Sequence, residues 1–358
     1  FTEPSPIHDL KAEYVGAEKV SLTWAVSDDA STSYTYRIEV VNGTSVRNLT
    51  SSDTKVEITE LIPGTMYNFT VFAVVAGGQT EGEGVSISLY TKPSPVLDLK
   101  AEHVGVTSVH LTWAVNNTAS NSYTYRIEVV NGTSVRNVTS SDIKVEITEL
   151  IPGTMYNFTV FAVAADGQTE GEGVSISLYT KPSPIHDLKA EYVGAEKVSL
   201  TWAVSDDAST SYTYRIEVVN GTSVRNLTSS DTKVEITELI PGTMYNFTVF
   251  AVVAGGQTEG EGVSISLYTK PSLIHDLKAE HVGVTSVSLI WAVNNTASTS
   301  YTYRIEVVSG TSVRNLMSNV TKVEITELIP GTMYNFTVFA VAADGETEGE
   351  GVSISLYT

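Results

Sequence analysis

The chain contains 358 residues, of which 42% are hydrophobic and 17% charged, with a formal net charge of -20 and no cysteine. This composition supports folded cores and argues against intrinsic disorder. The absence of cysteine excludes disulfides, zinc–thiolate sites and a cysteine nucleophile. The negative charge is spread along the whole length, which argues against a nucleic-acid partner. No apolar run of about eighteen residues is present, so we expect no membrane insertion of this fragment.

Near the N-terminus, short runs rich in Val, Ile, Thr and Tyr alternate apolar with polar residues. Such alternation is typical of antiparallel strands with one buried face. In the first of these runs Val20, Leu22 and Trp24 share a face, and the runs at 36–40 and 67–73 follow the same rule. No long segment has a helical period. We therefore predict an all-β domain in which Trp24 fills the centre between two sheets.

Two turn motifs connect these strands. Asn42-Gly43 predicts a type I′ hairpin, because both residue types accept positive φ angles. Pro63-Gly64 predicts a tight corner before the strand that carries Tyr67. A tyrosine in that place hydrogen-bonds its hydroxyl back across the corner, as in other β-sandwiches.

The same pattern occurs four times. Its tryptophans are spaced 89 residues apart, and the phrase Leu-Ile-Pro-Gly-Thr-Met-Tyr-Asn-Phe-Thr-Val recurs at the same interval. We predict four domains, at 4–92, 93–181, 182–270 and 271–358. The first and third repeats are identical at all 89 positions, which indicates duplication of a two-domain block. The predicted structural core residues are Trp24, Tyr67, Trp113, Tyr156, Trp202, Tyr245, Trp291 and Tyr334.

Three motifs in each repeat resemble a known family. Val-Ser-Leu-Thr-Trp, then Tyr-Arg-Ile-Glu-Val, then the Pro-Gly-Thr-Met-Tyr phrase are similar to the fibronectin type III pattern over essentially the whole chain. The resemblance implies four tandem immunoglobulin-like Greek-key β-sandwiches of seven strands each. It also implies chain ends at opposite poles of each domain, and hence an extended rod.

Within that family, Ser-Tyr-Thr-Tyr-Arg-Ile-Glu-Val, the Tyr-Asn-Phe-Thr strand and the Thr-Glu-Gly loop look most like the ectodomains of receptor-type tyrosine-protein phosphatases of the eta/beta (R3) group. This resemblance implies a membrane anchor and a cytoplasmic phosphatase elsewhere in a longer protein. Phe1-Thr2-Glu3-Pro4 aligns with Tyr90-Thr91-Lys92-Pro93, so we expect the chain to be a window from a longer array.

Asn-x-Ser/Thr sequons are dense, and they fall at predicted turns or outward strand positions. We interpret them as N-glycosylation sites, and hence the chain as extracellular. The alternative is that they are turn asparagines and strand threonines copied by duplication, with Asn42 serving mainly its turn. The thirteen predicted sites are Asn42, Asn48, Asn68, Asn116, Asn131, Asn137, Asn157, Asn220, Asn226, Asn246, Asn294, Asn319 and Asn335.

The sequence contains no strong pattern of a metal or ligand site. Asp28-Asp29 with Glu81 and Glu83 suggests a calcium site at one pole, but the second and fourth repeats carry asparagines instead of the aspartates, which favours a solvated acidic rim. Phe72 points outward near Arg37, either as an adhesive surface or covered by the arginine stem. The histidines do not cluster at ligand spacing, and we expect solvated strand residues: His8, His103, His110, His186, His275 and His281.

We therefore predict a chain without catalytic residues, cofactor or metal: a glycosylated spacer and protein-binding array from the ectodomain of a cell-surface receptor. Its expected partners are an extracellular protein ligand or neighbouring domains. One alternative is a secreted matrix adhesion protein of tenascin or fibronectin type. A second alternative is an engineered repeat scaffold. A third is an accessory array of an enzyme, which no residue of the sequence supports.

Overall fold

The computed structural model describes residues 3–27, 33–77, 79–116, 123–205, 211–253, 255–294 and 300–358. Within these ranges every regular element is a β-strand, and no helix long and apolar enough to span a bilayer occurs among them. The chain divides into two compact units, one up to Thr180 and the other from Lys181 on. Each unit contains two sets of seven strands, and we call the four sets domains 1 to 4 in chain order.

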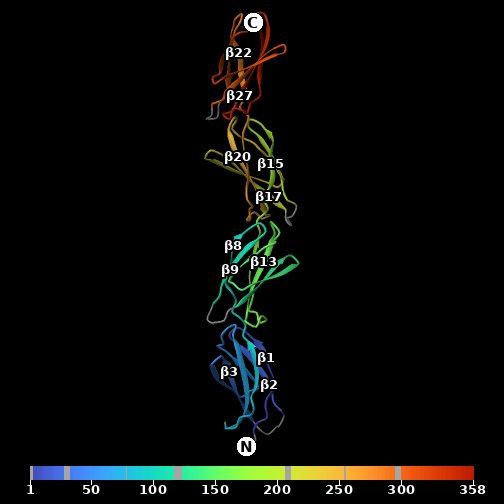
Figure 1. Ribbon diagram of the computed structural model, residues 1–358, viewed down its shortest axis with the longest axis vertical. Helices are drawn as coiled ribbons and strands as arrows, with labels where there is room; N and C mark the ends of the chain where they lie inside the picture. The colour runs from blue at the N-terminus through green and yellow to red at the C-terminus, as the bar shows by residue number, and fades with distance from the viewer. Residues whose placement is uncertain are drawn as a thin grey trace. The chain divides into compact units, whose positions relative to one another are not determined.

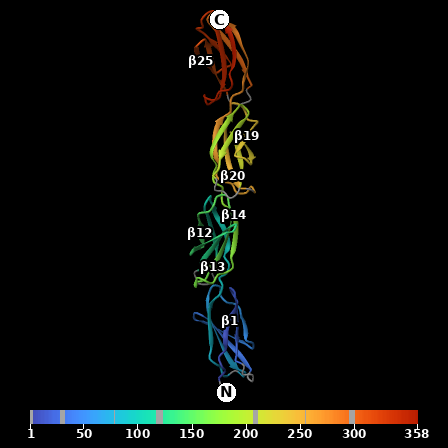
Figure 2. The same cartoon turned by 90° about the vertical axis from the view of Figure 1, so that its right-hand side faces the viewer.

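Domain 1 is a sandwich of two antiparallel sheets, one with the strand order β1-β2-β5 and the other β4-β3-β6-β7. Figures 1 and 2 show the two sheets facing each other. The central strands β2 and β6 carry the apolar alternation that the sequence predicts. The strands are β1 (His8–Val15), β2 (Val20–Ala25), β3 (Tyr34–Asn42), β4 (Ser45–Ser51), β5 (Lys55–Ile58), β6 (Met66–Val75) and β7 (Val85–Tyr90).

Domain 2 repeats this topology, with sheets β12-β9-β8 and β11-β10-β13-β14. Its strands are β8 (Leu97–Val104), β9 (Val109–Ala114), β10 (Thr124–Asn131), β11 (Ser134–Ser140), β12 (Lys144–Ile147), β13 (Met155–Val163) and β14 (Val174–Tyr179).

The second unit has the same two topologies again, in the sheets β15-β16-β19 and β18-β17-β20-β21 of domain 3 and β22-β23-β26 and β25-β24-β27-β28 of domain 4. The prediction of four all-β sandwiches is therefore confirmed. The strands are β15 (His186–Val193), β16 (Val198–Ala203), β17 (Tyr212–Asn220), β18 (Ser223–Ser229), β19 (Lys233–Ile236), β20 (Met244–Val253), β21 (Val263–Tyr268), β22 (Ile274–Val282), β23 (Val287–Val293), β24 (Thr302–Ser309), β25 (Ser312–Ser318), β26 (Lys322–Ile325), β27 (Met333–Val341) and β28 (Val352–Tyr357).

Each domain has one hydrophobic core between its sheets. In domain 1 the Trp24 side chain is 5% exposed, and Leu22, Ile38 and Phe69 are fully buried. The Trp24 ring meets Tyr36 edge-on, with ring centroids 5.1 Å apart, an arrangement that aromatic quadrupoles favour. The equivalent tryptophans are buried to the same degree, and so are the four corner tyrosines: Trp113, Trp202, Trp291, Tyr67, Tyr156, Tyr245 and Tyr334.

The corner tyrosines close the Pro-Gly turns with a hydrogen bond. The Ile62 backbone N–H donates to the Tyr67 hydroxyl at 2.9 Å, and the Ile151 N–H donates to Tyr156 at 3.0 Å. A buried backbone donor without a partner destabilises a fold. The tyrosine thus satisfies a backbone group that the turn itself leaves unpaired.

Two local features differ from the sequence expectation or escape it. Only Gly43 of the Asn42-Gly43 hairpin has a positive φ, at 59°, while Asn42 still belongs to β3 and pairs with Ser45. The type I′ prediction is therefore wrong, because a two-residue loop with a positive φ at its first residue alone follows the II′ pattern. No pattern in the sequence predicts the bulge in β1, where Asp9 adopts a φ of 53° and the pairing with β2 shifts.

Candidate interaction and glycan-bearing surface

The outer face of the four-stranded sheet is organised around one arginine in each domain. In domain 1 Arg37 of β3 pairs with Phe72 of β6, and its guanidinium carbon lies 4.0 Å from the ring centroid. The Arg37 Nε donates to Glu81 at 2.9 Å, and Nη1 donates to Asn48 Oδ1 at 2.7 Å and to Glu39 at 3.3 Å. We call Arg37, Glu39, Asn48, Phe72 and Glu81 the arginine cluster.

The cluster recurs in all four domains. In domain 2 the Arg126 guanidinium carbon lies 4.0 Å from the Phe161 ring centroid, and Nε donates to Glu170 at 2.7 Å. Hydrogen bonding to Glu170 raises the pKa of Arg126, and the same bond lowers the pKa of the Glu170 carboxyl group. Domains 3 and 4 place Arg215 over Phe250 at 3.9 Å and Arg304 over Phe339 at 4.0 Å.

Phe72 is half-buried rather than open to a partner. The arginine covers one side of the ring, and a Cβ added at Gly84 would lie 2.5 Å from the Phe72 Cε1 atom. Only glycine fits at that distance. Of the two sequence interpretations, the structure therefore favours the aromatic ring covered by Arg37 over an adhesive aromatic surface.

Two sequon asparagines of each of domains 1 to 3 share this outer face. In domain 1 Asn48 pairs with Glu39, and Asn68 pairs with Val41 two residues along β3. Because side chains of a strand alternate between faces, both asparagines lie on the side of Arg37. Asn48 is exposed, whereas Asn68 is half-buried and accepts a hydrogen bond from Ser88 at 2.8 Å.

Three further sequon asparagines lie at the ends of strands. Asn42, Asn131 and Asn220 end β3, β10 and β17 and are half-buried. In domain 4 Ser309 takes their place, yet it pairs with Ser312 as Asn42 does with Ser45, and Gly310 has a φ of 58°. The turn therefore forms without asparagine, so turn geometry alone does not account for the hairpin sequons. In domain 4 Asn335 pairs with Val308 as Asn68 does with Val41. Exposed asparagines in irregular segments complete the set: Asn116, Asn294 and Asn319.

Two histidines of domain 2 lie side by side, a contact that the sequence does not show. His103 of β8 and His110 of β9 face each other with ring centroids 5.8 Å apart, and His110 Nε2 lies 3.1 Å from the Glu146 carboxylate. The antiparallel pairing of β8 with β9 brings the two rings together. The spacing of the two histidines in the sequence does not show this pairing. In the described ranges no group of three or more His, Cys, Asp or Glu side chains is arranged to hold a metal ion.

The suspected calcium-binding loop falls partly outside the described residues. Asp28 and Asp29 lie there, so only the partner loop is visible. In that loop the Glu81 carboxylate is engaged by Arg37, which favours an internal ion pair over a cation site.

A family model for the fibronectin type III domain matches four segments, residues 5–88, 93–177, 182–266 and 269–355. The chain belongs to this family. Receptor-type tyrosine-protein phosphatase eta of Gallus gallus is 67% identical over 358 residues, which is 100% of this chain and 26% of that protein. The Mus musculus protein of the same name is 32% identical over 97% of this chain and 28% of its own length.

Tenascin-R of Gallus gallus is 23% identical over 95% of this chain and 25% of its own length. The chain thus spans about a quarter of the length of each of these curated relatives. The fibronectin type III assignment agrees with the strand order of all four domains.

Proposed function

We propose that this fibronectin type III array is part of the extracellular region of a receptor-type tyrosine phosphatase, where it acts as a glycosylated spacer and protein-binding array. The observation that carries the proposal is the 67% identity to receptor-type tyrosine-protein phosphatase eta of Gallus gallus across all 358 residues. The identity to tenascin-R is 23%, which favours the receptor over the matrix protein. A natural relative of such similarity also argues against an engineered scaffold.

In this proposal the chain itself performs no catalysis and needs no cofactor. The catalytic domain belongs to another part of the parent protein, and the domain boundaries are those of the 89-residue repeat. Partners are extracellular proteins or neighbouring domains. The net charge of -20 disfavours polyanionic ligands, because the summed field repels them.

Glycans would restrict where a partner binds. The outer face of the four-stranded sheet carries the sequons at Asn48 and Asn68 in domain 1. Asn48 belongs to the arginine cluster, so a sugar there would cover that cluster. The outer face of the three-stranded sheet has no sequon asparagine in its strands β1, β2 and β5. We therefore place the protein-binding surface of domain 1 on the three-stranded sheet.

Secretion and mass spectrometry test the glycoprotein part of the proposal. The chain is produced behind a secretion signal in vertebrate cells, and peptide N-glycosidase in heavy-oxygen water marks each occupied asparagine. We expect labelled Asn48, Asn137 and Asn226, which are exposed on strands. The same chain from bacterial cytosol is the control. If none of these three asparagines is labelled in the secreted chain, the proposal of an extracellular glycoprotein is contradicted.

The sequence of the parent transcript beyond Thr358 tests the receptor part. A hydrophobic span followed by a cytoplasmic His-Cys-x5-Arg motif is the expected result. A transcript that ends in further extracellular domains, with no such span, would replace the receptor by a matrix protein of the tenascin type.

A further inference from the structure

A tyrosine of domain 2 is inserted into the corner of domain 1. Tyr123, directly before β10, is 8% exposed, and its hydroxyl donates to the Pro63 carbonyl oxygen at 3.1 Å. A Cβ added at Gly64 would lie 2.4 Å from the Tyr123 Cε1 atom. The ring therefore occupies the space that any side chain at Gly64 would need.

The second unit repeats this contact between domains 4 and 3. Tyr301 is 4% exposed and donates to the Pro241 carbonyl oxygen at 3.2 Å. A Cβ at Gly242 would lie 2.3 Å from its Cε1 atom. The same geometry thus recurs in the second unit.

The linker between domains 1 and 2 leaves no free segment. The Lys92 N–H donates to the Gly16 carbonyl at 2.8 Å, and the Lys92 carbonyl accepts from the Gly64 N–H at 3.1 Å. The next residue, Pro93, already packs on domain 2, because a Cβ at Gly171 would lie 2.4 Å from the Pro93 carbonyl oxygen. Adjacent residues thus belong to different domains.

A loop of the even-numbered domain lies beside the same joint. Asp166 accepts hydrogen bonds from the backbone of Gln168 at 3.0 Å and of Thr169 at 2.9 Å, and from the Thr169 hydroxyl at 2.6 Å. With Met66 and Tyr90 of domain 1, this loop lines a cleft of about 610 Å³. All three bonds are internal to domain 2, so they hold the loop in shape without a group from domain 1.

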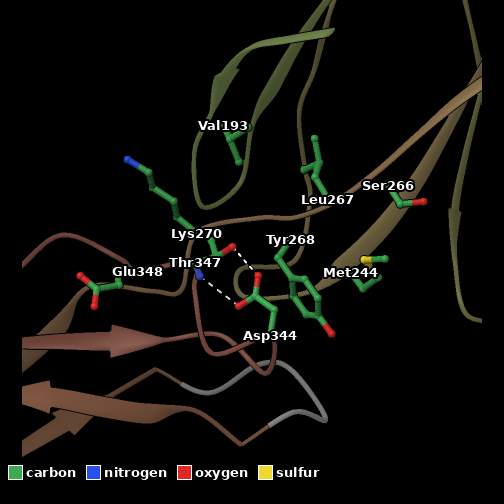
Figure 3. Close-up of a pocket in the computed structure, with 9 residues that line it drawn as sticks. All are labelled: Val193, Met244, Ser266, Leu267, Tyr268, Lys270, Asp344, Thr347 and Glu348. Carbon is green, nitrogen blue, oxygen red and sulfur yellow. Dashed lines mark hydrogen bonds between the residues drawn. The ribbon is translucent and has the colours of Figure 1, made fainter. Parts of the chain in front are cut away.

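The corresponding cleft in the second unit has a volume of about 510 Å³. Figure 3 shows Asp344 there, with dashed bonds to Thr347, next to Tyr268 of domain 3. The aspartate distinguishes even from odd domains: Gly77 and Gly255 stand at its place in domains 1 and 3, with φ angles of 114° and 109°.

We propose that domains 1 and 2, and likewise domains 3 and 4, are preassembled pairs, in which the Pro-Gly corner of the odd domain is a docking site for the tyrosine of the even domain that follows. The aspartate-fixed loop is the second contact of this joint. The proposal holds whatever receptor or matrix protein the array belongs to.

Spin-label distances test the joint in the full chain, which has no cysteine of its own. Lys55→Cys and Lys144→Cys place one label on β5 and one on β12, both at exposed positions. The doubly labelled chain that retains Tyr123 and Gly64 should give a single narrow distribution of label-to-label distances. Tyr123→Ala and Gly64→Ala should each abolish the narrow peak.

Gly43→Ala is the matched control for Gly64→Ala. Both glycines belong to domain 1 and have similar φ angles, 59° and 62°, but no atom of the described residues lies within 4 Å of a Cβ at Gly43. Both substitutions therefore impose similar backbone strain. Only the side chain introduced by Gly64→Ala would clash with the Tyr123 ring. A broad distribution in the parent chain overturns the proposal, and so does a Gly64→Ala distribution as narrow as that of Gly43→Ala.

Discussion

The guanidinium carbon of Arg126 lies 4.0 Å from the ring centroid of Phe161, so that the cation rests on the face of an aromatic ring on the outside of a β-sheet. The same group donates through Nε and Nη2 to both carboxylate oxygens of Glu170, at 2.7 and 2.8 Å. A planar guanidinium makes both contacts at once, whereas a lysine ammonium does not. The contact joins β10 to β13 and to the loop that carries Glu170.

Replacement of Arg126 should therefore destabilise domain 2. We expect Arg126→Lys and Arg126→Ala each to lower the free energy of unfolding of this domain by about 1–2 kcal/mol, since a partly exposed ion pair and a cation–π contact each contribute a fraction of that. Calorimetry of the full chain measures the effect, as one of four domain transitions moves to lower temperature. Equal unfolding temperatures of domain 2 in Arg126→Lys and the parent chain would show that the two-nitrogen contact of the guanidinium with Glu170 does not contribute to stability.

Acid should weaken the domains in which the carboxylate pKa is lowered. Hydrogen bonds from Arg126 and Arg304 lower the pKa of Glu170 and Glu348 from the ordinary value of 4.5. A carboxyl group with a lower pKa in the folded than in the unfolded chain stabilises the fold above its unfolded pKa, and this contribution disappears as the pH falls through the folded pKa. The stability of domains 2 and 4 should thus decrease as the pH falls below 4.5.

Glu170→Gln is the variant that checks this dependence. Denaturation midpoints between about pH 7 and pH 3 should fall less steeply for domain 2 of this variant than for the parent. Glu172→Gln is the control, because Glu172 is exposed and has no ion pair among the described residues. Identical slopes for the Glu170→Gln variant and the parent would refute the assigned role of the ion pair.

The corner hydrogen bond should be measurable on its own. Tyr156→Phe removes the hydroxyl that accepts from the Ile151 N–H and leaves the ring in place. We expect a loss of about 1–3 kcal/mol in domain 2, since the backbone donor is then left without its partner. Tyr179→Phe, at a half-buried residue on β14, serves as the control and should change the midpoint of chemical denaturation little.

Local periodicity explains why the strands and the core could be predicted. Trp24 and Phe69 lie on the buried faces of their strands because side-chain direction alternates with each residue, and this is visible in a short stretch of sequence. The type of the Asn42-Gly43 turn was predicted wrongly, because the sequence does not show that Asn42 continues to pair as part of β3.

The contact of Tyr123 with Gly64 could not be predicted in the same way. The tyrosine and the Pro-Gly corner are present in every repeat, so neither marks a joint, and the two groups are separated by a linker and by strands of both domains. The one available signal was the aspartate at 166 and 344 where the other repeats have glycine. Its meaning depends on the hydrogen bonds of a loop, which no periodicity reveals.

Domain 4 offers a test of the glycan-bearing surface by gain of a site. Asn315 on β25 lies where Asn48 lies on β4, and it accepts a hydrogen bond from Arg304 at 2.8 Å. Its sequon is interrupted by Met317, which is 62% exposed. Met317→Thr restores the Asn-x-Thr sequence, and the exposed side chain has no core packing to lose. We expect one additional glycan on the secreted chain, detected at Asn315 by mass spectrometry. Met317→Ala controls for loss of the methionine and should add none; an unmodified Asn315 in Met317→Thr, with Asn48 modified in the same sample, would show that the outer face alone does not define the site.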